Sequence, residues 1–291
     1  MRTISEAVNE RLSQVRNNKE VKRNDVIRVV YEKFPKLRQI DADLVQTRAE
    51  RLIASIERDE DPVKALNKRE EDLLEERKEF LIKNNIRDDF DEESVVCGSC
   101  NDTGYIKTKS GRTVVCRDCM IDAITEVFNE SGLADFTTYD MKSFKLDYYK
   151  DDNGERINKF KKLQSIIDGK GNNSVWILTG NVSSGKTYLA VVCCKYAILQ
   201  GYSAHYLKAD KLYELKPEEI SDLKTYDFIV VDDYAPEITN VYKNATNLHS
   251  LLEARMASDL PTVIVSSSSL AAIVEGSEER IAGKLRGAEV L

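Results

Sequence analysis

The chain has 291 residues, of which 42% are hydrophobic and 32% are charged, and its formal net charge is −7. This length suffices for one well-buried domain of ordinary size and something smaller, so two or three modules are expected. No run approaches the roughly 18 apolar residues of a membrane span, and Met1 to Glu10 lacks the apolar segment of a secretory signal, which predicts a cytoplasmic protein without membrane contact. The negative net charge excludes a global basic field, so any contact with nucleic acid needs a local patch.

Residues 1–95 are rich in charge and poor in glycine, and apolar side chains recur along them at helical spacing. The apolar positions are Ile40, Leu44, Val45, Ala49, Leu52, Ile53 and Ile56, followed by Leu73, Leu74, Phe80 and Leu81. Pro35 and Pro62 interrupt the pattern. The pattern predicts three or so helices with narrow apolar seams in a partner-binding domain over residues 1–95. Two interpretations remain open, a small bundle and arms that dock on a partner.

Four of the six cysteines form two Cys-x-x-Cys pairs fifteen residues apart. They are Cys97 with Cys100 and Cys116 with Cys119. Each pair lets two sulfur atoms reach one ion from a tight turn, and the segment between the pairs is typical of a β-hairpin that turns at Ser110–Gly111. We therefore expect a zinc ribbon or knuckle, with a linker, over residues 96–135. Redox-active thiols are the alternative, but they would need one such pair on a thioredoxin-like unit, which the sequence does not show.

The predicted zinc hairpin is also a candidate basic patch for single-stranded nucleic acid, since such sites combine cations with aromatic platforms. Its residues would be Tyr105, Lys107, Lys109, Arg112 and Arg117. A hairpin whose charges are simply solvated is the more frequent explanation.

The segment Gly180 to Thr187 matches the phosphate-loop pattern G-x-x-x-x-G-K-[ST]. It follows the apolar run Val175–Leu178, which predicts a buried strand, and it precedes the periodic segment Tyr188–Leu199, which predicts a helix. Backbone N–H groups at a helix N-terminus favour a polyphosphate, Lys186 would neutralise its β and γ phosphates, and the Thr187 hydroxyl would bind Mg²⁺. The predicted ATP-binding residues are Gly180, Asn181, Val182, Ser183, Ser184, Gly185, Lys186 and Thr187. The backbone N–H groups of residues 181–186 are expected to face the ligand.

A second nucleotide motif lies in "DFIVVDDY", where an apolar strand ends in two acids. Asp232 would contact Mg²⁺ and Asp233 would orient the attacking water, as in a Walker B strand. Many ATPases have Glu at the second position, and the shorter Asp predicts either a differently placed water or slow hydrolysis. The alternative for Asp233 is that it caps the next helix.

The rest of the chain alternates strands and helices, which predicts a parallel sheet covered on both faces by right-handed crossovers. The expected elements are a strand over 203–208, short helices, the Walker B strand, a helix over 241–258, a strand over 261–266 and a helix from about Ser277. In P-loop ATPases of the additional-strand kind, the strand after Walker B inserts between it and the phosphate-loop strand, so Ser266 to Ser269 are expected beside the γ-phosphate. Cys193 and Cys194 are interpreted as core, and His205 and His249 as structural or surface residues.

These motifs, in this order, resemble AAA+ helicase loaders of the DnaC/DnaI type, with the IstB transposition ATPases as close relatives. The resemblance covers most of the chain and rests on "FPKLRQIDADL", "CGSCNDTGYI" with "CRDC", "TGNVSSGKTYLA", "VVDDY", "LPTVIVSSSSL" and "EERIAGKLRGAEVL". It implies an α/β AAA+ ATPase domain over residues 136–291 with a five-stranded parallel sheet. The last strand would begin at "AEVL", just where the chain stops at Leu291, so a truncated last strand is expected and the tail found in relatives is expected to be short or missing.

The chain departs from the family pattern at two catalytic positions that the resemblance implies. Ser267 stands where the sensor strand commonly ends in Asn, and Lys284 stands where the family has the second of two arginines, the finger that reaches a neighbouring subunit's nucleotide. Arg280 matches the first arginine. Serine lacks the reach of an amide, and lysine lacks the bidentate fork of arginine, so we expect weak ATP hydrolysis.

The resemblance implies a helicase loader in DNA replication, of the phage or Gram-positive type. Its N-terminal helices would bind a hexameric replicative helicase, and its ATPase domain would self-associate and hold single-stranded DNA. Two alternatives remain: a transposition regulator of the IstB kind, and an adaptor that binds ATP with little hydrolysis.

Overall fold

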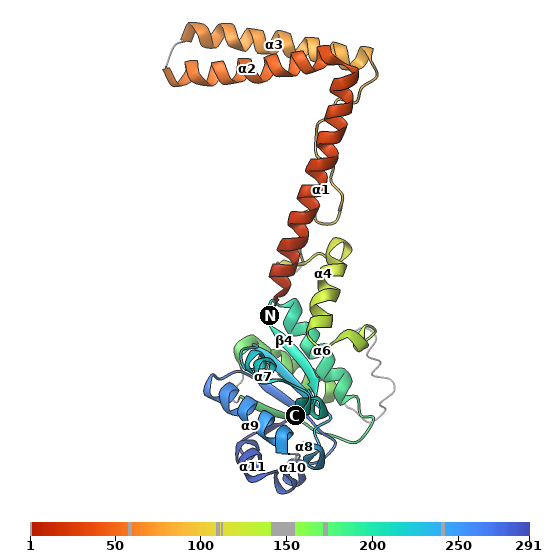
Figure 1. The fold of residues 1–291 in the computed structure, drawn as a ribbon, viewed down its shortest axis with the longest axis vertical. Coiled ribbons are helices and arrows are strands. Elements are labelled where there is room, and N and C mark those ends of the chain that lie inside the picture. The colour runs from red at the N-terminus through yellow and green to blue at the C-terminus, as the bar shows by residue number, and fades with distance from the viewer. Residues whose placement is uncertain are drawn as a thin grey trace. The chain divides into compact units, whose positions relative to one another are not determined.

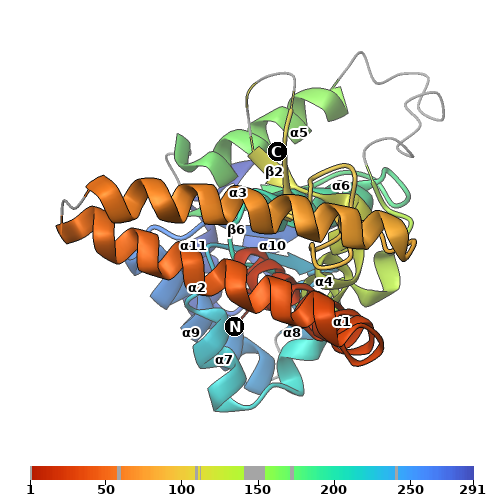
Figure 2. The ribbon, with the colours of Figure 1, turned by 90° about the horizontal axis from the view of Figure 1, so that it is seen from above.

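The computed structural model describes residues 2–57, 60–108, 111, 113–140, 155–170, 174–239 and 242–291 (Figures 1 and 2). The chain divides into two compact units, one made of Met1–Arg11 with Ser99–Leu291 and the other of Leu12–Gly98. The domain borders expected at residues 95 and 135 stay predictions. Among the helices in these ranges, none is both long and apolar enough to cross a membrane.

The unit Leu12–Gly98 is built from three helices, in agreement with the helical pattern of the sequence. They are α1 (Ile4–Lys33, which begins in the other unit), α2 (Pro35–Glu57) and α3 (Glu60–Lys83). Pro35 is the first residue of α2, where its missing N–H costs nothing. Helices α2 and α3 lie side by side and antiparallel (Figure 1). Leu37, Ile40 and Leu44 are buried on one face of α2.

A polar cluster ties the three helices of this unit together. The Tyr31 hydroxyl donates to Asp41 at 2.8 Å, and the Arg77 guanidinium donates to Asp41 at 2.7 Å and to Asp91 at 2.9 Å. Both partners of the Arg77–Asp41 pair are mostly covered, at 15% and 16% side-chain exposure. Such a shielded, multidentate pair holds its helices more firmly than an exposed one would.

In the other unit, a small antiparallel hairpin precedes a helix. The hairpin pairs β1 (Tyr105–Lys107) with β2 (Thr113–Val115), and α4 (Arg117–Glu130) follows. The start of α1 packs here, with Ala7 and Val8 fully buried and Arg2 hydrogen-bonded to Glu126 of α4 at 3.0 Å. The predicted turn residue Ser110, with Lys109 and Arg112, lies outside the described residues.

The centre of this unit is a five-stranded parallel sheet in the order β4-β5-β6-β3-β7. The strands are β3 (Val175–Leu178), β4 (Ala204–Lys208), β5 (Phe228–Asp232), β6 (Thr262–Val265) and β7 (Glu289–Val290). Residues of β3, β5 and β6 are buried on both faces, which explains their continuous apolar runs. Strand β6 inserts between β5 and β3 as predicted, and β7 is the expected short last strand. The predicted α/β fold with a five-stranded parallel sheet is thus confirmed.

Helices cover both faces of the sheet. The helices are α5 (Glu155–Ser165), α6 (Lys186–Leu199), α7 (Pro217–Leu223), α8 (Pro236–Thr239), α9 (Tyr242–Ala257), α10 (Leu270–Gly276) and α11 (Glu279–Leu285). One face packs on α7, α9, α10 and α11, while α6 contacts β4, β5 and β6. Shorter turns are η1 (Ala134–Phe136), η3 (Ile166–Lys170) and η4 (Ala209–Tyr213). This arrangement leaves the carboxyl ends of the strands open for a ligand.

Candidate nucleotide site and metal centre

The phosphate loop joins β3 to α6, as its sequence requires. Ser183 and Gly185 have φ values of 62° and 84°, and Gly185 is the N-cap of α6. Left-handed backbone at the cap suits glycine, which has no Cβ to clash. One N–H departs from the expected orientation, because the Ser184 amide donates to the Asn181 carbonyl at 3.1 Å within the loop.

Lys186 lies across this loop. Its ammonium donates to the carbonyl oxygens of Gly180 and Asn181, both at 2.8 Å. Burial lowers the pKa of Lys186, and the nearby charges of Asp232 and Asp233 oppose that shift. The cation is therefore held at the loop, within reach of the acids that end β5.

A cavity of about 670 Å³ opens between the loop and the carboxyl ends of β4, β5 and β6. It brings together nine of the predicted residues. They are Val182, Ser183, Ser184, Gly185, Lys186, Thr187, Asp232, Asp233 and Ser267. Gly180, Asn181, Arg280 and Lys284 do not line it. Its size is within the range of small-molecule sites, and its lining combines cations, hydroxyls and carboxylates.

Asp232 is the buried acid of this cavity, with no exposed surface. One carboxylate oxygen, Oδ1, accepts the Asp233 N–H at 2.8 Å, and the other, Oδ2, accepts the Tyr206 hydroxyl at 2.7 Å. Each oxygen keeps a further lone pair, and the Thr187 hydroxyl lines the same cavity. Hard oxygen donors of this kind fit Mg²⁺.

Asp233 has a different environment from its neighbour. Its backbone is left-handed, with φ of 54°, and its side chain is 63% exposed. The Lys208 ammonium lies 3.2 Å from its carboxylate, and that contact raises the pKa of Lys208. Sequence reasoning missed Lys208, although parallel pairing of β4 with β5 places it opposite Asp232.

The segment that follows β6 contributes two serines to the cavity wall. Ser266 is buried, its hydroxyl donates to the Tyr234 carbonyl at 2.7 Å, and it accepts the Ser268 N–H at 3.1 Å. Ser267 is exposed and lines the cavity. The hydroxyl at this position is therefore free to turn toward a ligand, while Ser266 fixes the backbone beneath it.

The two cations of α11 lie away from this cavity. The Arg280 side chain is 76% exposed and lies 3.8 Å from Glu278. Lys284 forms an ion pair with Glu253 of α9 at 3.5 Å and is 21% exposed. Neither reaches the nucleotide cavity of its own chain.

The connector that follows α4 up to Asp140 carries aromatic residues that the sequence analysis did not assign to a site. Tyr139 lines the cavity and stacks on Tyr188, with ring centroids 4.5 Å apart and planes at 21°. The Lys195 ammonium donates to the carbonyls of Phe136 and, at 3.0 Å, of Tyr139. No local motif marks this segment as part of a site.

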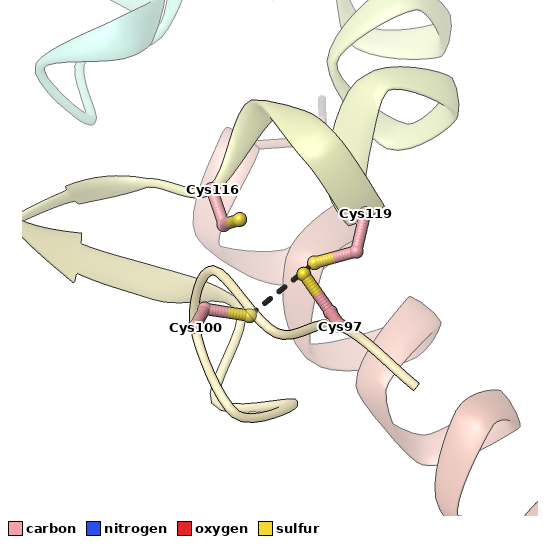
Figure 3. Close-up of side chains that lie close together, drawn as sticks. All are labelled: Cys97, Cys100, Cys116 and Cys119. Atoms are coloured by element: carbon pink, nitrogen blue, oxygen red, sulfur yellow. Dashed lines mark hydrogen bonds between the residues drawn. The ribbon is translucent and has the colours of Figure 1, made fainter. Parts of the chain in front are cut away.

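The four predicted zinc ligands meet in space (Figure 3). Their sulfur atoms all lie within 4.8 Å of one another, and those of Cys100 and Cys119 are 3.5 Å apart. Tetrahedral zinc with sulfur ligands at about 2.3 Å requires sulfur atoms about 3.8 Å apart, so this set fits the ion. Cys116 is the N-cap of α4, and its N–H donates to the Gly104 carbonyl at 2.8 Å.

Comparison with known proteins supports the resemblance read from the motifs. No family model matches the chain. The replicative helicase loader DnaC of Escherichia coli K12 is 24% identical over 137 residues, which are 43% of this chain and 56% of that protein. The chain thus matches about half the length of this curated relative. This sequence similarity confirms the resemblance to DnaC-type loaders.

Solved structures with similar folds include DnaI and a DnaA. The DnaI structure gives a TM-score of 0.44 at 19% identity, covering 53% of this chain and 87% of that one. DnaA from Aquifex aeolicus bound to AMPPCP gives a TM-score of 0.43 at 17% identity, covering 48% of this chain and 46% of that one.

Proposed function

We propose that this protein is an ATP-dependent helicase loader in DNA replication. The observation that supports it best is one cavity that joins the phosphate loop, Thr187 and Asp232, in a chain similar to a replicative helicase loader. In this proposal the AAA+ domain binds the nucleotide, and the N-terminal helices bind the helicase.

In the nucleotide site, each residue has a role that its position permits. Bound Mg²⁺ would neutralise phosphate charge, and Thr187 with Asp232 would hold it. When ATP binds, the Lys186 ammonium would exchange its hydrogen bonds to the Gly180 and Asn181 carbonyls for contacts with the β and γ phosphates. The flexible lysine side chain permits this motion. Asp233 would orient water, and Lys208 at 3.2 Å would steady its carboxylate.

The helicase-binding surface is proposed on α2. Besides its buried face, α2 has an outer apolar face, defined here by Val45, Ala49, Leu52 and Ile56, with Ile53 beside it. Leu52 is 63% exposed and Ile56 is 73% exposed. Four such residues at helical spacing form the apolar stripe by which one helix docks on another protein.

Self-association and DNA binding complete the proposal. Arg280 is exposed on α11 and would contact a second copy of the chain. Lys284 would break its ion pair with Glu253 and contact the nucleotide bound by that second copy. Single-stranded DNA would be held by the assembled AAA+ domains, with Lys107 and Arg117 of the zinc module as further candidate contacts.

The ATP-gated adaptor is the second candidate. Its support is that Lys284 already has a partner in its own chain, at 3.5 Å from Glu253, and lacks the fork of an arginine. An IstB-like regulator has no observation of its own in its favour. Steady-state ATP hydrolysis with and without single-stranded DNA separates a motor, which should be stimulated, from an adaptor.

Lys186→Ala tests the nucleotide site itself. Because the ammonium serves the loop rather than the core, this substitution should abolish binding of a fluorescent ATP analogue and leave thermal unfolding unchanged. Lys211→Ala, which removes an exposed lysine paired with Glu214, is the matched control and should bind normally. Unchanged affinity in Lys186→Ala would refute nucleotide binding at this loop.

A further inference from the structure

The Tyr206 side chain makes a buried hydrogen bond to Asp232 that the sequence motifs do not predict. Tyr206 lies on β4 and is 4% exposed, and its hydroxyl donates to Oδ2 of Asp232 at 2.7 Å. Asp232, on the neighbouring strand, is fully buried. A hydrogen bond to a charged acceptor in such surroundings is among the stronger kinds.

This contact completes a two-point hold on the carboxylate. Oδ1 accepts the Asp233 N–H at 2.8 Å, so each oxygen receives one donor from a different direction. With both oxygens engaged, rotation about the bond between Cβ and the carboxylate would break a hydrogen bond. The plane of the carboxylate, and with it the direction of its remaining lone pairs, is therefore fixed.

The hydroxyl itself is firmly placed. The Tyr206 ring packs edge-to-face on Phe136, with centroids 5.0 Å apart and planes at 74°. Its backbone N–H donates to the Ser131 carbonyl at 2.9 Å, beyond the edge of the sheet. Parallel pairing with β5 fixes Tyr206 opposite Val230, two residues before Asp232. The donor cannot follow the carboxylate if the carboxylate turns away.

We propose that Tyr206 is a positioning residue for Asp232, holding its carboxylate in the orientation that binds the magnesium of MgATP. This inference rests on the proposed nucleotide site and assigns a role to a residue of a different strand. A ligand held by an outer partner binds its metal more tightly, because the orientation is fixed before the metal arrives.

Tyr206→Phe removes only the hydroxyl and is the test. Affinity for a fluorescent ATP analogue is titrated against Mg²⁺, starting from magnesium-free buffer without EDTA, since EDTA would also strip zinc. The magnesium concentration for half-maximal effect should rise about tenfold, in line with the loss of outer partners at metal sites. Affinity without magnesium should stay within about twofold, because Asp232 then has no ion to hold.

Tyr226→Phe is the matched control, since it removes the hydroxyl of a ring that lies against His205 rather than beside Asp232. It should leave the magnesium requirement unchanged. An unchanged requirement in Tyr206→Phe would overturn the inference, and so would loss of magnesium-free binding or of folding, which would assign the hydroxyl to the fold. If the wild-type protein binds no nucleotide, the proposed function fails first.

Discussion

At the scale of single residues, a buried polar side chain holds the unit with the parallel sheet together without any sequence motif. Arg255 has no exposed surface, and it donates to the Leu223, Tyr226 and Pro261 carbonyls and to the Thr262 hydroxyl at 2.6 to 3.1 Å. Burial lowers its pKa to about 10. These neutral acceptors lie on two segments, the one from the end of α7 to β5 and the one at the start of β6, so the guanidinium joins both segments to α9 and its role is structural.

His205 is a half-buried polar residue, and it makes stability depend on pH. Its Nδ1 has no partner within the described part of the chain, its ring lies 5.2 Å from that of Tyr226, and burial lowers its pKa to about 4. The unfolded chain has an ordinary histidine pKa of about 6.5, so it binds a proton first as the pH falls. The contribution of His205 is full above pH 6.5 and is lost between pH 6.5 and 4.

We therefore expect the free energy of unfolding to fall by roughly 2 kcal/mol from this residue between pH 7.5 and 5. Urea unfolding, followed by the fluorescence of the single tryptophan Trp176 in β3, measures it. His205→Leu should remove that share of the pH dependence. The free energy of unfolding of the variant, relative to that of the wild type, should therefore rise as the pH falls. A constant difference between the two proteins across this range would contradict the assignment.

The residues of the candidate nucleotide site differ in how far the sequence predicts them. Gly180 to Thr187 form a contiguous motif whose spacing is set by the phosphates, and Asp232 follows a recognisable strand. Tyr139, Tyr206 and Lys208 come from other elements, and their places depend on how strands pair and on where a connector runs. Lys208 could have been found by aligning β4 with β5, whereas no signal in the sequence points to Tyr139.

At the scale of elements, periodicity predicted the helices and strands that bury a whole face. The helix predicted over 241–258 is α9 at Tyr242–Ala257, and the strand predicted over 261–266 is β6 at Thr262–Val265. Helix α4 was missed, although Met120, Ala123, Ile124 and Val127 have helical spacing and are buried. Helix α10 is too short for a clear period, with seven residues.

The connector after α4 depends on one glycine. Gly132 has a φ of 78°, and a Cβ built there would lie 2.1 Å from the Tyr206 carbonyl oxygen. The connector packs this close because the Ser131 carbonyl accepts the Tyr206 N–H. Only glycine allows both the left-handed backbone and the approach to β4.

Gly132→Ala should lower the free energy of unfolding by roughly 2–5 kcal/mol, the sum of left-handed strain and overpacking. Gly169→Ala is the matched control, since φ there is 76° and nothing lies within 4 Å of the added Cβ. It should show the strain alone, roughly 1–2 kcal/mol. Equal losses in urea unfolding for both variants would rule out the clash with β4.

The zinc module should depend on its metal. Strands β1 and β2 have three residues each, too few to be stable alone. Metal analysis should find about one zinc per chain, since four thiolates complete a tetrahedral site. Cys100→Ser should lose most of that zinc and unfold the hairpin, while Cys194→Ala, in the core of α6, should keep it. Folded wild-type protein with less than about a tenth of the expected zinc would be incompatible with this site.

At the scale of the whole molecule, the alternation of strands and helices predicted a parallel sheet, and the place of β6 between β5 and β3 was predicted from P-loop ATPases with an additional strand. What the sequence left open was whether residues 1–95 form a bundle or an arm for a partner. The structure gives α2 two apolar faces, one buried with Leu37, Ile40 and Leu44 and one exposed. A helix that packed only against the other helices of its own unit would need a single apolar face.

The outer apolar face of α2 therefore provides the last prediction, the capture of a replicative helicase. Leu52→Glu with Ile56→Glu should weaken binding to the purified hexameric helicase of the same organism by about tenfold or more, since exposed apolar anchors dominate such interfaces. Nucleotide affinity and helical content should not change, because both side chains are exposed. Binding is measured by surface plasmon resonance on the full-length chain.

The matched control is Gln39→Glu with Gln46→Glu, which adds the same charge at exposed positions of α2 roughly 90–130° around the helix from the outer apolar face. If both double variants lose the helicase equally, charge rather than the apolar stripe governs binding. If neither loses it, α2 is not the docking helix, and the helicase must bind elsewhere on the chain. Loss in Leu52→Glu with Ile56→Glu alone would assign the second apolar face of α2 to the partner, because the charge is the same and only the apolar contact differs.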